Sequence, residues 1–391
     1  GTPLFVYSKA AIVAAVAAYQ RGFAGRNAQI CYAMKANSSL SILKLLAQAG
    51  CGCDIVSGGE LERVLAAGGR ASQVIFSGVG KTRTEMRRAL QVGVQCFNVE
   101  SEAELDVLSE VASNLGALAP VSIRVNPNVD AKTHPYISTG LKGNKFGVAH
   151  DRVLATYQHA ASLPGIRVVG IDCHIGSQIT QAAPYLEAMD KVLDLVVAIE
   201  AAGIPIHHID FGGGLGIDYN GDTPPAADAL WAQLLQRLDA RGFGQRQLMI
   251  EPGRSIVGNA GVCLTEVLYL KPGEQKNFCI VDAAMNDLPR PAMYQAFHQI
   301  APVTPRSSAA STYDVVGPVC ESGDWLGRDR ALAVQQGDVL AVLSAGAYCM
   351  AMASNYNTRN RAAEVLVDGS AAHLIRERER FEQQMQCERL V

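Results

Sequence analysis

A lysine directly follows an apolar run in residues 32–37, which read Tyr-Ala-Met-Lys-Ala-Asn. The apolar run is typical of a buried strand, and residues 37–39 supply polar N-cap side chains for a helix that begins near Leu40. Lys35 is therefore predicted at the carboxyl end of a strand, where α/β folds place their active sites. A desolvated lysine there can act as an amine nucleophile and form a Schiff base. The alternative is a surface lysine at the mouth of a loop.

Three consecutive glycines end another predicted strand, at Gly212, Gly213 and Gly214. Their backbone N–H groups can approach a phosphate closely, and (β/α)8 barrels often bind phosphate in the loops after strands seven and eight. A tight turn without a ligand is the alternative. The dinucleotide pattern G-x-G-x-x-G is not met, because Ile217 occupies the place of its last glycine.

Acidic, basic and aromatic side chains also come at predicted strand ends. Glu251 and Arg254 could pair with each other, or Glu251 could hold a ring nitrogen protonated while Arg254 binds an anion. His174, with Ser177 three residues later, suits a flat platform beside an anion-binding turn. A histidine satisfied within the core is the alternative for that position.

Two further charged residues keep two interpretations each. Asp54 follows the second predicted strand and could cap a helix, lie in the core or serve the site. Arg124 lies inside a predicted buried strand and must be paired there. A structural salt bridge and a role in the site both remain open for Arg124.

Together these groups suggest one cofactor. A nucleophilic lysine, a phosphate-binding loop, a ring platform and an acid for a pyridine nitrogen are the parts that hold pyridoxal phosphate. We expect no metal site, because the close pair Cys51 and Cys53 does not have the usual zinc spacing.

The segments that must position these residues alternate between strands and amphipathic helices. Eight strands joined by helices over roughly 230 residues predict a (β/α)8 barrel, with an open doubly wound sheet as the alternative. The predicted strands are 29–34, 53–56, 74–76, 96–99, 121–125, 167–173, 207–211 and 248–251.

The pattern changes after Gly258, where strands follow one another with few helices between them. We expect a barrel domain over 10–258 and a β-rich domain over 259–391, which the N-terminal strand 1–9 joins. The tail, 374–388, is predicted as a charged helix. The predicted strands of this part are 262–270, 278–282, 312–316, 331–334, 339–343 and 363–367.

Composition narrows the class of protein. Of the 391 residues, 49% are hydrophobic and 18% charged, with a formal net charge of -3, which is typical of a soluble globular protein without a nucleic-acid or membrane-surface role. No apolar run approaches the ~18 residues that span a bilayer, and no signal peptide is visible. The 10 irregularly spaced cysteines suggest free thiols in a reducing cytoplasm.

Nearly the whole chain resembles the fold-type III pyridoxal-phosphate decarboxylases, and within them the branch that acts on diaminopimelate. The motifs that carry this resemblance are Y-A-M-K-A-N (32–37), D-I-V-S-G-G-E (54–60), R-V-N-P (124–127), H-P-Y-I-S-T-G (134–140), K-F-G (145–147), H-I-G-S-Q (174–178), G-G-G-L-G (212–216), E-P-G-R (251–254), N-D-L-P-R-P-A-M-Y (286–294), C-E-S (320–322) and A-G-A-Y (345–348).

The resemblance implies a role for each matching residue. Lys35 would attach the cofactor, His174 would stack on its ring, and Glu251 would pair with its nitrogen. Asp54 would belong to the same cofactor site. The residues around the phosphate would be Ser177, Gly212, Gly213, Gly214, Arg254 and Tyr348, of which Arg254 and Tyr348 would also approach the substrate.

The resemblance also implies a substrate and a dimer. Arg290 and Tyr294 would bind a carboxylate of a small amino acid, meso-2,6-diaminopimelate, which would be decarboxylated to L-lysine. Cys320, as proton donor, and Glu321, which would recognise the distal amine, would come from the second subunit of a homodimer with shared active sites. The related ornithine and arginine decarboxylases usually carry an aspartate after the cysteine. A decarboxylase of ornithine, arginine or a carrier-bound amino acid, and a non-catalytic homologue, are the alternatives.

Overall fold

The computed structural model describes residues 1–130 and 144–391, so the motif at 134–140 lies outside the described residues. The chain divides into two compact units. The barrel unit comprises residues 14–216 and 223–255, and the β unit comprises residues 1–13, 217–222 and 256–391.

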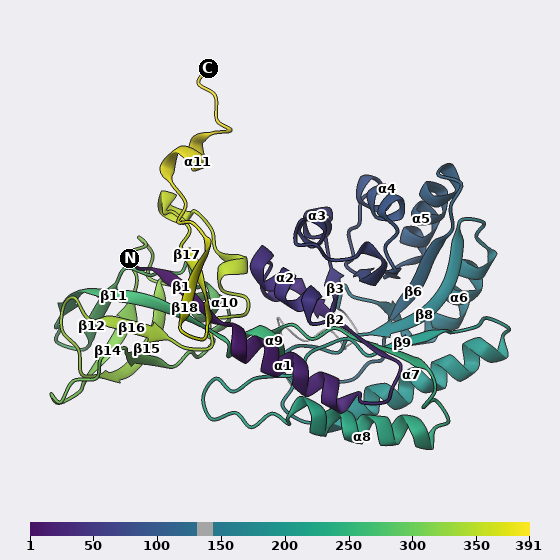
Figure 1. Ribbon diagram of the computed structural model, residues 1–391, viewed down its shortest axis with the longest axis horizontal. Coiled ribbons are helices and arrows are strands. Elements are labelled where there is room, and N and C mark those ends of the chain that lie inside the picture. The colour runs from purple at the N-terminus through teal and green to yellow at the C-terminus, as the bar shows by residue number, and fades with distance from the viewer. Residues whose placement is uncertain (131–143) are drawn as a thin grey trace. The chain divides into compact units, whose positions relative to one another are not determined.

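Eight parallel strands close into a barrel in the barrel unit, which confirms the predicted (β/α)8 fold (Figure 1). Closure comes from the pairing of the eighth strand with the first, Leu248 opposite Ala28. A two-residue strand, β7 (Val148–Ala149), pairs with the carboxyl end of β6 (Ala119–Asn126). The barrel strands are β2 (Ala28–Ala33), β3 (Gly52–Ile55), β4 (Val74–Phe76), β5 (Cys96–Val99), β6 (Ala119–Asn126), β8 (Ile166–Cys173), β9 (His208–Asp210) and β10 (Gln247–Ile250).

Helices connect these strands, and polar residues define several of their first turns. Thr82 accepts a hydrogen bond from the Glu85 N–H while Glu85 bonds back to Thr82, so a capping box begins α4. Ser57 and Ser101 cap α3 and α5 by accepting one backbone N–H each through their side chains. The helices are α1 (Lys9–Gly22), α2 (Leu40–Gln48), α3 (Gly58–Ala66), α4 (Arg83–Val92), α5 (Glu102–Asn114), α6 (Val153–Ser162), α7 (Ala183–Ala201), α8 (Ala227–Ala240) and α9 (Arg254–Val257).

The start of α2 differs in detail from the prediction. Ser39 occupies the N-cap position, but its side chain makes no capping hydrogen bond. Asn37 instead uses Oδ1 to accept from the Ser39 N–H at 3.1 Å, as in an Asx turn. The polar residues after Lys35 therefore shape the loop that leads into the helix.

The β unit is mostly sheet, as expected. Its strands run in the order β15-β14-β12-β11-β1-β17-β18, and β16 joins β11 to β13. The N-terminal strand β1 lies between β11, to which it is antiparallel, and β17, to which it is parallel. The strands are β1 (Leu4–Ser8), β11 (Gly261–Lys271), β12 (Asn277–Val281), β13 (Ile300–Pro302), β14 (Ser311–Val316), β15 (Trp325–Leu332), β16 (Val339–Val342), β17 (Ala363–Asp368) and β18 (Ala371–Arg376).

Two elements of the β unit were predicted wrongly. The tail is not a helix over 374–388, because β18 extends to Arg376 by pairing with β17, and only α11 (Phe381–Met385) is helical. The strand predicted at 331–334 begins at Trp325, because β14 supplies partners for its polar residues. In both cases strand pairing outweighs the local residue pattern.

A further short helix, α10 (Arg290–Tyr294), lies in this unit. No helix among the described residues is both long and apolar enough to cross a membrane.

Candidate active site

Lys35 lies in a short 3-10 helix, η1 (Met34–Ala36), directly after β2, as its motif predicted. Its Nζ donates to Oδ2 of Asp54 on β3 at 2.6 Å. The Asp54 side chain is fully buried, whereas 38% of the Lys35 side chain is exposed. Asp54 is therefore the anionic partner of Lys35, and the helix-cap interpretation is wrong because Ser57 caps α3.

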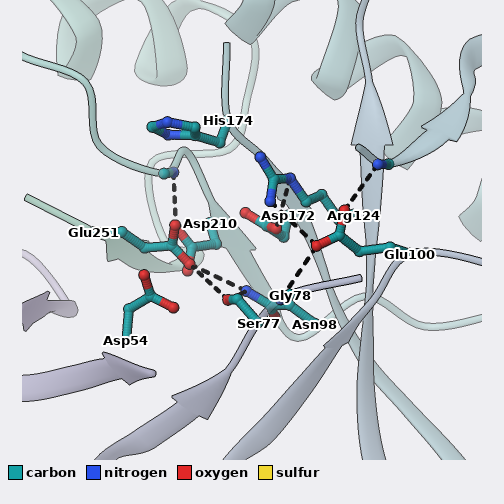
Figure 2. A network of polar contacts seen from close by, with 12 residues as sticks. Asp54, Ser77, Gly78, Asn98, Glu100, Arg124, Asp172, His174, Asp210 and Glu251 are labelled. Carbon is teal, nitrogen blue, oxygen red and sulfur yellow. Dashed lines mark hydrogen bonds and ion pairs between the residues drawn. The ribbon is translucent and has the colours of Figure 1, made fainter. Parts of the chain in front are cut away.

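Three buried carboxylates converge at the carboxyl ends of β8, β9 and β10 (Figure 2). Oxygens of Asp172, Asp210 and Glu251 lie within 4.8 Å of one another. Oε1 of Glu251 accepts from Nδ2 of Asn98 at 3.1 Å and from Oγ of Ser77 at 3.4 Å. Asp172 and Asp210 were not predicted from the sequence, although both lie within the last two residues of a strand, where the same positional rule applies.

The burial of these acids changes their protonation. Desolvation raises the pKa of Asp172 to about 7 and raises the pKa values of Asp210 and Glu251 well above the usual range, and repulsion between the carboxylates adds to this. Among the described residues, Oδ1 of Asp172 and Oδ2 of Asp210 have no hydrogen-bond partner. Their spacing suits a metal ion, but protonated acids are poor ligands. A cationic ring nitrogen beside Glu251 would favour its ionised form.

Arg124 braces this cluster from β6. Its guanidinium lies 3.3 Å from Oε1 of Glu100 and 4.0 Å from Oδ2 of Asp172, and it stacks over the Phe146 ring at 5.0 Å. Oε2 of Glu100 also accepts from the Gly147 N–H at 2.9 Å. The structural salt bridge that the sequence left open for Arg124 is thus present.

His174 and the glycine loop form one connected segment. The Gly213 N–H donates to Nδ1 of His174 at 3.2 Å, so the ring hydrogen is assigned to Nε2. Desolvation lowers the pKa of His174 well below its usual value, and the positive charges of Arg124 and Lys35 lower it further. A neutral, oriented imidazole is suited to stack on an aromatic ring.

Close backbone packing explains why the loop consists of glycines. A Cβ at Gly213 would lie 2.1 Å from the carbonyl oxygen of Glu251, and one at Gly212 would lie 2.5 Å from that of Cys173. Gly212 and Gly214 also have positive φ, 66° and 101°. The Gly212 and Gly213 N–H groups bond within the protein, to Asp210 and His174. The loop therefore offers a phosphate fewer open backbone N–H groups than the three expected from the sequence.

Arg254 supplies a positive charge beside this loop. It donates to Oγ of Ser177 from Nη2 at 3.0 Å and from Nε at 3.3 Å. Glu251 bonds to Asn98 and Ser77, so the acid and the guanidinium have different partners. The anion-binding interpretation of Arg254 fits this arrangement.

The remaining predicted residues lie in the β unit. Nη1 of Arg290, on α10, bonds to Nε2 of His298 at 2.8 Å, and its guanidinium stacks over the Tyr219 ring at 4.6 Å. Nδ1 of His298 faces the Leu343 carbonyl oxygen at 2.8 Å, so Nδ1 carries the hydrogen and Nε2 accepts from Arg290. Tyr294 is the last residue of α10. His298 lies only eight residues after Arg290 but belongs to none of the predicted motifs, and Tyr219 is distant from Arg290 in the chain.

Cys320 and Glu321 are exposed in the loop between β14 and β15. The Cys320 N–H donates to Oδ1 of Asn357 at 2.9 Å, and Tyr356 donates to Oε2 of Glu321 at 2.9 Å. Tyr348 has a positive φ of 57° and is half-buried. Tyr356 and Asn357 belong to none of the predicted motifs.

Comparisons with known proteins identify the family. The profile described as "Pyridoxal-dependent decarboxylase, pyridoxal binding domain" matches residues 9–258. The chain is 58% identical over 379 residues to diaminopimelate decarboxylase of Pseudomonas aeruginosa, covering 97% of this chain and 91% of the relative. It is 56% identical over 385 residues to the enzyme of that name from Neisseria meningitidis serogroup A, covering 98% and 94%.

This chain belongs to the pyridoxal-dependent decarboxylases. The crystal structure of diaminopimelate decarboxylase from Helicobacter pylori complexed with L-lysine superposes with a TM-score of 0.94 at 42% identity, covering 99% of this chain and 96% of that chain. The crystal structure of lysine decarboxylase from Selenomonas ruminantium is more distant, with a TM-score of 0.85 and 25% identity, covering 94% and 93%.

The barrel unit of this decarboxylase fits pyridoxal 5′-phosphate, the cofactor of its family. The ring nitrogen of that cofactor is a base that a buried acid can keep protonated, and Glu251 is such an acid among unsatisfied carboxylate oxygens. The neutral His174, the side-chain nitrogen of Lys35 and the Arg254–Ser177 pair match the ring face, the aldehyde and the phosphate in chemical character.

Proposed function

We propose that this chain decarboxylates meso-2,6-diaminopimelate to L-lysine and CO2 with pyridoxal 5′-phosphate, the last step of lysine biosynthesis. Full-length relatives at 56–58% identity support this substrate. Within the chain, the proposal depends most on Arg290, a buried guanidinium that His298 and Tyr219 hold in one orientation. A buried, oriented arginine suits a substrate with a second carboxylate.

Diaminopimelate carries an amine and a carboxylate at the end remote from the reaction. Arg290, with Tyr294 on the same helix, would bind the distal carboxylate, and Glu321 would bind the distal ammonium group. Ornithine, arginine and lysine have a distal cation without a carboxylate. A site built for both charges would leave Arg290 unpaired with those substrates, and the loss of that pair would weaken their binding.

The cofactor would supply the electron-accepting ring, and the residues of the barrel unit would hold it. Lys35 would attach it through Nζ, Glu251 would face the ring nitrogen, and His174 would cover the ring. Asp54 would orient Lys35. The phosphate would lie among Ser177, Gly212, Gly213, Gly214, Arg254 and Tyr348, with Arg254 and Tyr348 also near the substrate.

The reaction replaces a carboxylate with a hydrogen at the α-carbon, so one proton must be delivered there as CO2 leaves. We propose the thiol of Cys320 as the donor, because it is one of two exposed thiols in the chain. Cys320 and Glu321 would enter the site from the second subunit of a homodimer. All ten cysteines are free, which suits the reducing cytoplasm that we propose as its location.

The test is a product assay with purified protein, added pyridoxal phosphate and meso-diaminopimelate. We expect lysine and CO2 in equal amounts. Ornithine, arginine and lysine serve as comparison substrates, and we expect their kcat/KM values to be lower by about tenfold to a hundredfold, the effect of leaving a charged group without its hydrogen bond. Faster turnover of any of them would assign the chain to another amino acid.

A matched variant shows whether the lysine formed comes from this site or from a contaminating enzyme. Lys35→Ala removes the group that attaches the cofactor, so lysine formation should fall to background. Unchanged activity in this variant would reject the proposed cofactor site.

A further inference from the structure

The segment η6 (Tyr356–Thr358) bonds to both members of the exposed pair Cys320 and Glu321. Tyr356 donates its hydroxyl hydrogen to Oε2 of Glu321 at 2.9 Å. Asn357 uses Oδ1 to accept the backbone N–H of Cys320 at 2.9 Å. Tyr356 therefore holds Glu321 through its carboxylate, and Asn357 holds Cys320 through its backbone.

The backbone of this segment has an uncommon conformation. Asn357 has φ 54° and ψ 28°, and Thr358 has φ 56°. Asparagine tolerates the left-handed region, but a β-branched threonine is an outlier there. Such a conformation persists only where surrounding contacts impose it, and it is often associated with function.

Those contacts are present around η6. Thr358 donates its N–H to the Asn355 carbonyl at 2.8 Å, and Asn355 donates through Nδ2 to the Arg359 carbonyl at 3.0 Å. Arg359 in turn donates from Nε to Oδ1 of Asn286 at 3.0 Å. Asn286 lies four residues before Arg290, so η6 is tied to the segment that leads into α10.

The loop that carries Cys320 and Glu321 is tied to the same segment by a buried acid. Asp324 accepts from the Val319 N–H through Oδ2 at 2.7 Å and from the Met285 N–H through Oδ1 at 2.6 Å. The base of the loop is therefore fixed. The side chain of Glu321 and the N–H of Cys320 are held by η6.

We propose that Tyr356 and Asn357 are positioning residues, Tyr356 orienting the carboxylate of Glu321 toward the distal amine of the substrate and Asn357 orienting the backbone that carries the Cys320 thiol. This inference rests on the roles given to Cys320 and Glu321 in the proposed function. It predicts that the two contacts act on different kinetic constants. The Glu321 contact governs substrate binding, and the Cys320 contact governs the proton-delivery step.

The first experiment removes one hydroxyl group. Tyr356→Phe should raise KM for meso-diaminopimelate by about threefold to tenfold, the effect of one hydrogen bond, with kcat within about twofold of the parent enzyme. Tyr269→Phe is the matched control, because Tyr269 is an exposed tyrosine of the same unit, 60% accessible, on β11. Equal KM values for Tyr356→Phe and the control would overturn the role of Tyr356.

The second experiment changes Asn357 without straining the backbone. Asn357→Gly keeps the left-handed conformation and removes the acceptor, whereas Asn357→Asp keeps both. We expect kcat to fall by about threefold to tenfold in Asn357→Gly and to recover to within about twofold in Asn357→Asp. Equal kcat for Asn357→Gly and the parent would overturn the role of Asn357. A loss of kcat that Asn357→Asp does not restore would overturn it as well.

A third readout does not depend on the substrate. In a Cys387→Ser background, Cys320 is the remaining exposed cysteine. The rate of its alkylation by iodoacetamide in the holoenzyme should change by at least about twofold in Asn357→Gly and stay unchanged in Tyr269→Phe. If the parent enzyme does not convert diaminopimelate, the proposed function fails, while the alkylation rates still test whether Asn357 positions Cys320. Identical rates in the parent and Asn357→Gly would overturn that role of Asn357.

Discussion

Nζ of Lys35 lies 2.6 Å from Oδ2 of Asp54, and the carboxylate of Asp54 is fully buried. A buried carboxylate needs a countercharge, because its desolvation is costly when it is unpaired. The pair therefore fixes the direction of the lysine amine at the carboxyl ends of β2 and β3. It also links Lys35 to the acid cluster of Asp172, Asp210 and Glu251, since Asp54 contributes to the raised pKa of Glu251.

Replacing Asp54 tests this link. Asp54→Asn keeps the shape of the side chain and removes its charge, so kcat/KM should fall by about tenfold to a hundredfold, the effect of losing a charge-assisted hydrogen bond. Borohydride reduction followed by mass spectrometry of peptides should still find the cofactor on Lys35. A variant with normal kcat/KM would show that Asp54 does not orient the lysine.

The buried acids predict a pH dependence of stability in the cofactor-free protein. The pKa of Asp172 is about 7 in the folded protein, compared with ~3.9 in an unfolded chain. The folded state thus holds the proton more tightly, so this stabilisation is fully present below about pH 4 and is lost as the pH rises toward about 7. Asp210 and Glu251 shift in the same direction.

The measurement is the Tm of cofactor-free protein between pH 5 and pH 8, where we expect a decrease with rising pH. Asp172→Asn should reduce that decrease, because the amide does not ionise. Identical pH profiles for the parent and this variant would contradict the raised pKa of Asp172.

A pair of glycine substitutions tests the packing of the loop after β9. Gly213→Ala would place a Cβ 2.1 Å from the carbonyl oxygen of Glu251, and neither Gly213 nor Gly80 has a positive φ. We expect Gly213→Ala to destabilise the protein by about 1–3 kcal/mol, as overpacking does, and to weaken cofactor binding. Gly80→Ala is the control, since nothing lies within 4 Å of its added Cβ. Equal Tm values for the two variants would contradict the close approach.

The hydrogen bond between Arg290 and His298 predicts that replacing His298 weakens substrate binding. His298→Phe removes the acceptor for Arg290 and the donor to the Leu343 carbonyl. We expect KM for diaminopimelate to rise by about tenfold, while kcat changes less, because a distal carboxylate contact mainly binds the substrate. A His298→Phe enzyme with normal KM would show that Arg290 needs no such support.

The sequence predicted the barrel, and the place where several candidate site residues meet, for one physical reason. The carboxyl ends of parallel barrel strands meet at one mouth, so residues such as Lys35, Asp54 and Glu251 are brought together by strand order alone. The same rule would have found Asp172 and Asp210. The local residue pattern gave wrong predictions for the tail and for the start of β15, because pairing between strands outweighs that pattern.

The amino-acid sequence by itself determined the order of the strands and which residue types stand at their ends, because hydrophobic periodicity and loop chemistry are local. Only the tertiary structure decided the partners. Asn98 holds Glu251, Glu100 holds Arg124, and residues 356–357 hold residues 320–321 across long stretches of chain. These contacts follow from packing between distant segments, which local spacing does not encode, and they orient the groups that they hold.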